Sequence, residues 1–301
     1  MIVMYYYHGK NKPTAFFEGW YLRHQNGKDT LALIPAFHCD QSGTSSASLQ
    51  VITNHQSWWV PFDANLFCAD DKTFDVFLGQ NRFCRKGVYL DIDTDDLKLR
   101  GILEYGEFTP PQYSMMGPFS LLPAMECNHG ILSFGHTVSG SVLLNGCTLD
   151  FSSSTGYIEK DWGKSFPKGY VWTQCNRFGT VPCSIFISVA QIPLGAFEFT
   201  GCIASVVYGA QEMRLATYLG AKVLRVSHNE IILRQGKVLL WAQLLEFQEH
   251  PLRAPNLGGM DRIIHESAAC RVRYRLFCND VLKLDLTSRQ AGFEWNNIKI
   301  C

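Results

Sequence analysis

The sequence predicts an all-β protein, and three observations support this fold class. Almost every periodic segment alternates apolar and polar residues, which is the pattern of a strand with one buried face. Gly, Asn, Asp and Pro separate these segments at short intervals, as expected of turns between strands. No convincing stretch carries apolar residues at positions i, i+3, i+4 and i+7 over three helical turns. Strands at this spacing are typical of barrels or sandwiches.

The strands follow one another along both halves of the chain. Asn145-Gly146 lies between two alternating segments and predicts a hairpin, because Asn-Gly supplies the positive φ angles of a type I′ turn. Turn residues at Gln235-Gly236 and Asn279-Asp280 predict two further hairpins. Strands are predicted at residues 47–53, 74–78, 88–92, 97–105, 184–192, 197–207, 213–226, 231–234, 237–243, 270–277 and 281–287.

The length of 301 residues is that of about two domains. Residues 106–130 are the least strand-like stretch, rich in Pro, Gly and Met, and we expect a loop there over the mouth of a first barrel. A second break at 152–156 follows the Asn145-Gly146 hairpin. The boundary is therefore predicted here, giving two antiparallel β domains, 1–155 and 156–301.

Composition excludes several classes of partner. Lys plus Arg and Asp plus Glu each number 27, so the net charge is zero and no footprint for nucleic acid or an anionic membrane exists. Charged residues make up only 18% of the chain and aromatic residues 13%, which favours a small or apolar ligand. No signal peptide or transmembrane segment is predicted, so we expect a soluble cytoplasmic protein. The sequence leaves the oligomeric state open.

The richest chemistry lies at residues 156–167, Gly-Tyr-Ile-Glu-Lys-Asp-Trp-Gly-Lys-Ser-Phe-Pro. At strand period, Tyr157, Glu159 and Asp161 share one face and the alternate residues share the other. Two close carboxylates beside an apolar wall favour the protonated form of one of them, which would make a proton donor. The alternative is a structural ion-pair latch around Lys160.

Two other strands carry candidate site residues. Just downstream, Trp172, Gln174 and Asn176 share a face, and amides beside an indole suit a ligand with polar and apolar ends. Near the start of the chain, Glu18 and Trp20 share a face, where large rings would desolvate the acid. The alternative for Glu18 is a surface strand on which it pairs with a lysine.

Motifs for metals and cofactors are incomplete. Glu126 and His129 have the spacing of half a di-iron site, but a second copy is missing, so both are interpreted as polar groups lining a pocket. Residues 91–96 imitate the start of an EF-hand loop but lack its Gly and its final Glu. Walker, Rossmann and nucleophile-elbow motifs are also absent. We expect neither a metal nor a cofactor.

Taken in order along the chain, these motifs resemble the tocopherol cyclase-like family of two-domain, lipocalin-like β proteins. The resemblance implies two lipocalin-like barrels or sandwiches in tandem. It also implies an enzyme that closes a ring on a prenylated hydroquinone or similar isoprenoid, without a cofactor or a redox change. The residues that carry it are Phe17-Glu18-Gly19-Trp20-Tyr21, Tyr157-Ile158-Glu159-Lys160-Asp161-Trp162-Gly163, Phe166-Pro167, Trp172-Thr173-Gln174-Cys175-Asn176 and Leu252-Arg253-Ala254-Pro255.

For the site, the resemblance implies an acid that protonates an alkene, rings that stabilise the resulting cation, and polar groups that orient the head group. Two alternatives remain open: a carotenoid-hydratase-like enzyme, in which water replaces the phenol, and a non-catalytic lipocalin-like binder of an apolar isoprenoid or lipid. The predicted catalytic residues are Asp161, Glu159 and Glu18, and the predicted substrate-binding residues are Trp20, Tyr157, Trp162, Trp172, Gln174, Asn176, Glu126 and His129.

Overall fold

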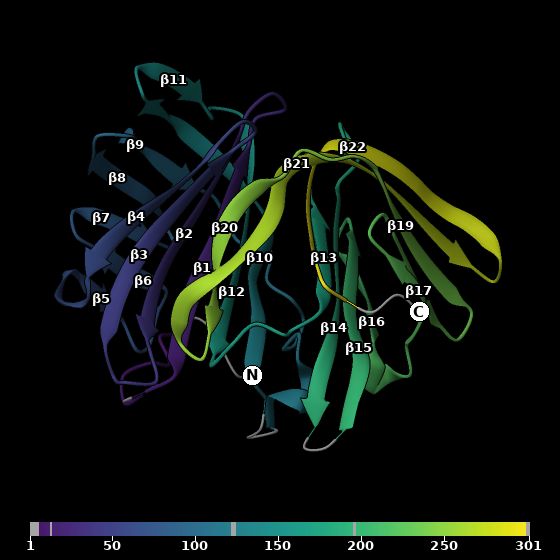
Figure 1. Ribbon diagram of the computed structural model, residues 1–301. Coiled ribbons are helices and arrows are strands. Elements are labelled where there is room, and N and C mark those ends of the chain that lie inside the picture. Colours follow the sequence, from purple (N-terminus) through teal and green to yellow (C-terminus); the bar gives the residue numbers. More distant parts are fainter. Residues whose placement is uncertain (1–5, 13, 122–124, 195–196, 299–301) are drawn as a thin grey trace. The chain divides into compact units, whose positions relative to one another are not determined.

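The computed structural model describes residues 6–12, 14–121, 125–194 and 197–298, and most of them form antiparallel strands (Figure 1). The all-β prediction is confirmed. The helical elements of the described residues are short 3₁₀ turns: η1 (Ala64–Leu66), η2 (Gly117–Leu121) and η3 (Thr217–Leu219). In this described part, no helix is long and apolar enough to cross a membrane.

Contacts divide the chain into two compact units, each built from segments far apart in the sequence. The first unit contains the described residues up to Met115 together with Glu126–Phe166 and Leu252–Ile263. The second contains Met116–Met125, Pro167–Pro251 and the described residues from Ile264 onwards. The expectation of a single loop at 106–130 over the first barrel is thus wrong for the described residues 116–121 and 125, which belong to the second unit, and for 127–130, which begin a strand; residues 122–124 lie outside the described part. The division into domains 1–155 and 156–301 stays a prediction.

The first unit is a 12-stranded antiparallel sheet in which β12, the strand with the acidic motif, lies between β1 and β10. The order along the sheet is β4-β3-β2-β1-β12-β10-β9-β8-β7-β6-β5, with β11 paired to β10. The strands are β1 (Phe16–Gln25), β2 (Thr30–Cys39), β3 (Ser45–Thr53), β4 (Ser57–Asp63), β5 (Phe67–Ala69), β6 (Asp75–Leu78), β7 (Asn81–Cys84), β8 (Gly87–Asp93), β9 (Lys98–Tyr105), β10 (Cys127–Leu144), β11 (Cys147–Asp150) and β12 (Ser154–Gly163).

The core of the first unit forms from one face of these alternating strands. Trp20 and Leu22 of β1 and Ile158 of β12 contribute to it, so the intervening residues of both strands face away from this core. The predicted turn between β10 and β11 is confirmed, since Asn145 has φ 48° and Gly146 has φ 85°.

The second sheet is antiparallel and has ten strands: nine follow the order β16-β15-β14-β13-β22-β21-β19-β18-β17, and the tenth, β20, pairs with β21. The strand predicted at 213–226 is wrong as a single element: Gly220, with φ 86°, ends η3 between β16 and β17. The strands are β13 (Tyr170–Cys175), β14 (Cys183–Leu194), β15 (Phe197–Tyr208), β16 (Gln211–Ala216), β17 (Lys222–Ser227), β18 (Glu230–Gln235), β19 (Val238–Glu246), β20 (His250–Asn256), β21 (Gly259–Cys278) and β22 (Val281–Asn296).

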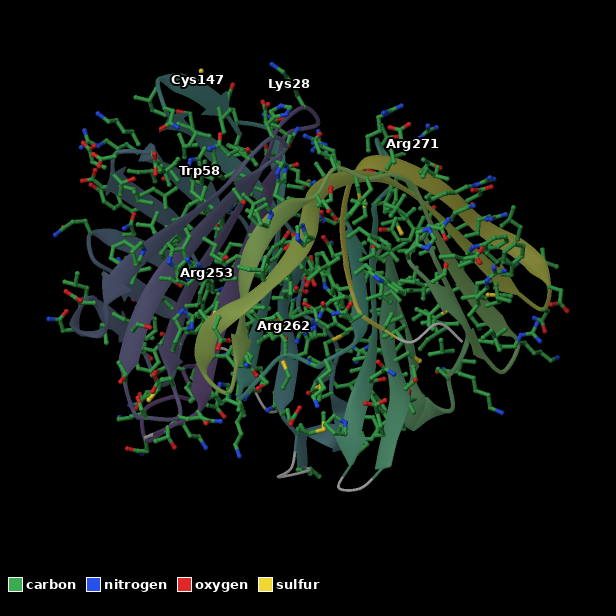
Figure 2. All side chains as sticks on the ribbon, in the orientation of Figure 1. Lys28, Trp58, Cys147, Arg253, Arg262 and Arg271 are labelled. Atoms are coloured by element: carbon green, nitrogen blue, oxygen red, sulfur yellow. The ribbon has the colours of Figure 1, made fainter. Side chains whose placement is uncertain are left out.

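The tip of the β20–β21 hairpin belongs to the first unit, although it lies late in the sequence. Gln50 on β3 accepts a hydrogen bond from the Arg253 backbone N–H at 2.7 Å and donates one to its carbonyl at 3.0 Å. The Arg253 guanidinium lies over the ring of Trp59, with Cζ 4.9 Å from the ring centroid. Figure 2 labels Arg253 and Arg262 on this hairpin. The late Leu-Arg-Ala-Pro motif therefore has a docking role within the first unit.

Candidate active site on strands β10 and β12

Strand β12 presents two chemically different faces, as its alternation predicts. Glu159 lies opposite Tyr21 of β1 and Ile131 of β10, and Asp161 lies opposite Gly19 and His129. Residues directly opposite in an antiparallel pair share a face. Gly19 has no side chain, so Asp161 meets no side chain from the directly opposite position on β1.

Four side chains on this face form a continuous line, which we call the acidic array: Asp161, His129, Glu159 and Tyr157. Asp161 Oδ1 is 3.0 Å from His129 Nδ1. The other ring nitrogen, Nε2, lies 3.8 Å from Glu159 Oε2. The Tyr157 hydroxyl donates to the same Glu159 oxygen at 2.5 Å. The array therefore joins two carboxyl groups through an imidazole and ends on a phenol.

The array runs from a partly exposed end to a buried end. The side-chain exposure is 23% for Asp161, 16% for His129 and 7% for Glu159, and Tyr157 is fully buried. Burial raises the pKa of Tyr157 well above its usual value, and the charge of Glu159 adds to this effect. Tyr157 thus remains a neutral hydrogen-bond donor. Of the two acids, Glu159 is the less exposed to solvent.

A cysteine lies beside the exposed end of the array. Cys127 Sγ is 3.9 Å from Asp161 Oδ1. Burial raises the pKa of the Cys127 thiol well above its usual value, and the charge of Asp161 raises it further. Cys127 is therefore a protonated thiol near neutral pH and is poorly suited to act as a nucleophile.

On the opposite face of β12, Lys160 forms a buried ion pair with Glu18, and both side chains are fully buried. The Glu18 carboxylate also accepts the His8 backbone N–H at 2.7 Å and lies 3.0 Å from His8 Nδ1. Burial lowers the pKa of Lys160, and the charge of Glu18 opposes this effect. With a lysine, a backbone amide and a histidine around it, Glu18 is held as a paired acid.

Aromatic rings enclose this ion pair. Lys160 Nζ lies 5.1 Å from the ring centroid of Trp20 and 5.0 Å from that of Trp162, within the range of cation–π attraction. The ring of His8 stacks on Trp162 with centroids 4.3 Å apart. The segment around His8 is thereby fastened to the sheet by Lys160, Glu18 and Trp162.

Apart from Glu126, the predicted site residues of the first unit consequently fall into two groups on opposite faces of the sheet. Tyr157, Glu159, Asp161 and His129 come together in the acidic array. Glu18, Trp20 and Trp162 surround Lys160 on the other face. The ion pair offered as the alternative for Glu18 exists, but it is buried rather than on the surface.

Other predicted residues lie outside both groups. Trp172 and Gln174 are buried on β13 of the second unit, on the face opposite the core residues Val171 and Cys175, and Asn176 follows that strand. Their role in substrate binding stays a prediction.

Glu126 precedes β10, and its backbone carbonyl accepts the N–H groups of Lys164 and Ser165. This contact ties the start of β10 to the end of β12. Substrate binding by the Glu126 side chain stays a prediction.

Three residues near these groups were not predicted as site residues. His8 lies in a segment with no periodic pattern, so nothing in the sequence pointed to its contact with Glu18. Tyr21 and Arg23 are buried on β1, on the face of the acidic array, with Arg23 opposite Tyr157. Continuing the period-two pattern along β1 from Gly19 would have found both.

The glycine of the acidic motif, Gly163, is required at its position for a steric reason. It has φ 152°, and a Cβ atom there would lie 2.2 Å from the carbonyl oxygen of Glu126. Only glycine lets the end of β12 approach the start of β10 so closely. This approach sets the pairing that brings His129 beside Asp161.

The array also has the spacing of a metal site. Ligand atoms of His129, Glu159 and Asp161 all lie within 4.8 Å of one another, and a histidine with two carboxylates is a donor set used by several divalent metals. The hydrogen bonds from Tyr157 to Glu159 and between His129 and Asp161 already engage these atoms. The expectation of a site without metal stays a prediction.

Comparison with known proteins points to one family. Residues 92–193 match the family model described as tocopherol cyclase-like. The probable chloroplastic tocopherol cyclase of Oryza sativa subsp. japonica is 29% identical over 91 residues, which is 30% of this chain and 19% of that protein. The chloroplastic tocopherol cyclase of Zea mays is 25% identical over 125 residues, 40% of this chain and 26% of that protein. The matches thus span about a quarter or less of these relatives.

Solved structures share the fold at low sequence identity. CghA superposes with a TM-score of 0.61 at 9% identity, covering 94% of this chain and 88% of its own. Kievitone hydratase from Nectria haematococca superposes with a TM-score of 0.57 at 11% identity, covering 99% of this chain and 94% of its own. These similarities confirm the tandem lipocalin-like β fold. The family model over residues 92–193 and the two plant enzymes confirm the resemblance to the tocopherol cyclase-like family that the motifs predicted.

Proposed function

We propose that this protein is a cofactor-free enzyme that protonates an isoprenoid double bond and closes a ring on a prenylated hydroquinone or similar isoprenoid. One observation carries the proposal: the acidic array places a desolvated carboxyl group between a phenol donor and a histidine that a second carboxylate orients. Similarity to two plant tocopherol cyclases supports the reaction class.

Glu159 is the proposed proton donor, because it is the less exposed of the two acids and burial favours its neutral form. Its proton adds to one alkene carbon and leaves a tertiary cation on the other. The phenol oxygen of the substrate then bonds to that cation and releases its own proton. The sum of these steps is an isomerisation, so neither an oxidant nor a reductant is consumed.

His129 is the proposed acceptor of the phenol proton. Asp161 holds Nδ1, so Nε2 is directed towards Glu159 and can return the proton to it. The distance of 3.8 Å from Nε2 to Glu159 exceeds a hydrogen bond, and such catalytic contacts often shorten only when substrate is bound. The buried ring of Tyr157 and the ring of Tyr21 on the same face would stabilise the cation.

The test is incubation of the full chain with a prenylated hydroquinone in heavy water, followed by mass spectrometry. We expect a ring-closed product that carries one carbon-bound deuterium. Glu159→Gln should lower kcat by about 100-fold or more, the usual contribution of a general acid, with a smaller change in KM. Glu104→Gln, an exposed acid on β9 of the same sheet, is the matched control and should turn over like the wild type.

Other outcomes separate the alternatives. Deuterium uptake together with added water would indicate a hydratase, as the name of the Nectria haematococca neighbour suggests. A lipid that binds but gains no deuterium would indicate a carrier. If Glu159→Gln and Asp161→Asn both keep full turnover, the array is not the proton donor. Turnover that survives a chelator would support the absence of a metal, and turnover lost to it would contradict the proposal.

A further inference from the structure

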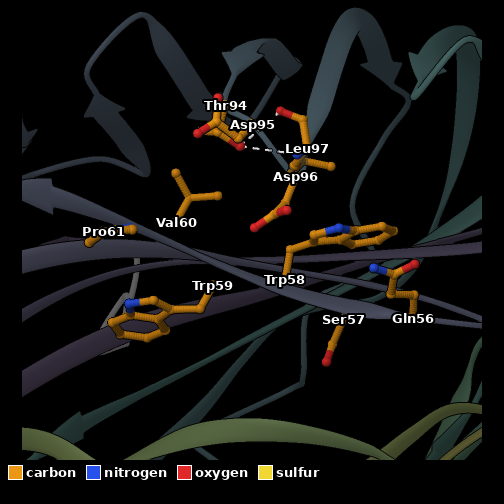
Figure 3. A pocket seen from close by; sticks show the side chains of 10 residues that line it. All are labelled: Gln56, Ser57, Trp58, Trp59, Val60, Pro61, Thr94, Asp95, Asp96 and Leu97. Carbon is orange, nitrogen blue, oxygen red and sulfur yellow. Dashed lines mark hydrogen bonds between the residues drawn. The ribbon is translucent and has the colours of Figure 1, made fainter.

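A cavity of about 520 Å³ lies in the first unit, between edge strand β4 and the turn that joins β8 to β9 (Figure 3). This volume is in the range of small-molecule binding sites. The lining includes the adjacent residues Trp58 and Trp59, the buried residues Val60 and Leu97, and the exposed residues Asp95 and Asp96. It therefore combines apolar and aromatic surface with two acids, and it contains no Lys, Arg or His.

The acids on the rim differ from their neighbours in charge pairing. Asp91 and Asp93 on β8 are neutralised by Arg100, at 2.8 Å and 3.2 Å. Within the described residues, Asp95 and Asp96 form no ion pair, and both are exposed. Two uncompensated carboxylates beside one another attract a cation.

The turn that presents these acids is fixed by hydrogen bonds. The Thr94 backbone N–H donates to the Leu97 carbonyl at 2.9 Å, and the Leu97 N–H donates to Thr94 Oγ1 at 3.0 Å. The Asn145 side chain donates to the Asp96 carbonyl at 3.3 Å. The carboxylates therefore stand on a rigid support, which reduces the entropy lost on binding a ligand.

The indole of Trp58 supplies the second recognition element. Its ring packs partly against the core, and its Nε1–H is buried without a hydrogen-bond partner among the described residues. Because this N–H is closed to solvent, a ligand in the cavity would contact the indole through its ring. Figure 3 shows Trp58 on the same side of β4 as Asp96, whereas Trp59 points to the other side.

We propose that this cavity binds a small organic ammonium ion. The cation would lie against the ring of Trp58 close to the carboxylates of Asp95 and Asp96. Aromatic faces beside carboxylates are the usual recognition elements for alkylated ammonium groups. This site is separate from the acidic array and does not depend on the proposed reaction.

The test is isothermal titration calorimetry of the full chain with choline and with 3,3-dimethyl-1-butanol, its neutral carbon isostere. Choline should bind at least about tenfold more tightly, because the isostere keeps the shape and the hydroxyl but lacks the charge. Trp58→Leu should weaken choline binding by about 3- to 30-fold, and Trp58→Phe should weaken it less.

A double variant tests how much the two carboxylates contribute to binding. The double substitution Asp95→Asn and Asp96→Asn should weaken binding by about fivefold at low salt and flatten its salt dependence. Trp241→Leu is the control and should bind choline like the wild type, since Trp241 is on β19 of the second unit, lies against Arg275 and does not line the cavity. Equal affinity for the neutral alcohol would overturn the proposal. So would unchanged binding in the Trp58 and Asp variants, or no saturable binding at about 10 mM choline.

Discussion

Single residues on the two faces of β12 differ in what their charges do. Glu159 lies in a line of hydrogen-bonding groups, whereas Glu18 is buried against Lys160, whose ammonium group lies over two aromatic rings. A buried ion pair is weak evidence for net stability, but breaking one by removing a single partner leaves an uncompensated charge. The Lys160 face is therefore interpreted as structural and the Glu159 face as chemical.

Replacing Lys160 by Met tests the structural role. The buried Glu18 carboxylate would lose its cation, so we expect the free energy of unfolding to fall by about 3 to 5 kcal/mol. Urea denaturation monitored by tryptophan fluorescence measures this loss. The double variant Lys160→Met with Glu18→Gln also removes the unpaired charge, so it should recover most of the lost free energy of unfolding. A double variant as unstable as Lys160→Met alone would contradict the structural interpretation.

At the scale of elements, the pairing of β12 with β10 decides where the array lies. The strands meet closely because Gly163 has no Cβ, and the pairing then places His129 opposite Asp161. Sequence pattern predicted both strands' chemistry but not their adjacency, since β10 and β12 are separated by the β11 hairpin.

Gly163→Ala tests this element. Its Cβ would meet the Glu126 carbonyl at 2.2 Å, so the start of β10 must shift and His129 must move with it. We expect a destabilisation of about 2 kcal/mol or more together with a lower kcat. Gly146→Ala is the control, because its φ of 85° is strained for alanine but no atom lies within 4 Å. Gly146→Ala should lower the free energy of unfolding by only about 1 kcal/mol and leave kcat unchanged. Equal effects of the two variants on kcat would contradict the argument.

For the whole molecule, the buried histidines predict that the two units respond differently to acid. Burial lowers the pKa of His24 to about 4 and the pKa values of His38 and His136 to about 3, and all three lie in the first unit. In the unfolded chain these side chains titrate near pH 6.5. Below that pH the unfolded chain binds protons that the folded unit does not, so stability falls as the pH falls.

The first unit should therefore lose stability between pH 6.5 and pH 4, by up to about 1.4 kcal/mol per pH unit for each histidine. Hydrogen exchange at several urea concentrations, compared at pH 7.5 and pH 5, resolves the two units. His38→Gln should make the pH dependence shallower, whereas His228→Gln, an exposed residue of the second unit, should leave it unchanged. Equal acid sensitivity of both units would contradict this expectation.

The sequence by itself determined the fold class, most strands, the Asn145-Gly146 turn and the two faces of the acidic motif. All of these depend on local alternation and turn chemistry, which are written in neighbouring residues. The prediction of one strand at 213–226 was wrong because the alternating pattern did not reveal the turn that ends at Gly220.

Tertiary structure alone decided which residues meet. It paired Glu18 with Lys160 across 142 positions and His129 with Asp161 across 32. In the folded protein the late hairpin around Arg253 also contacts the first unit, and Trp58 lines the same cavity as Asp95 and Asp96. These contacts depend on strand order and register, which are set by burial of the whole core. The sequence of a single strand does not indicate which strand will be its neighbour.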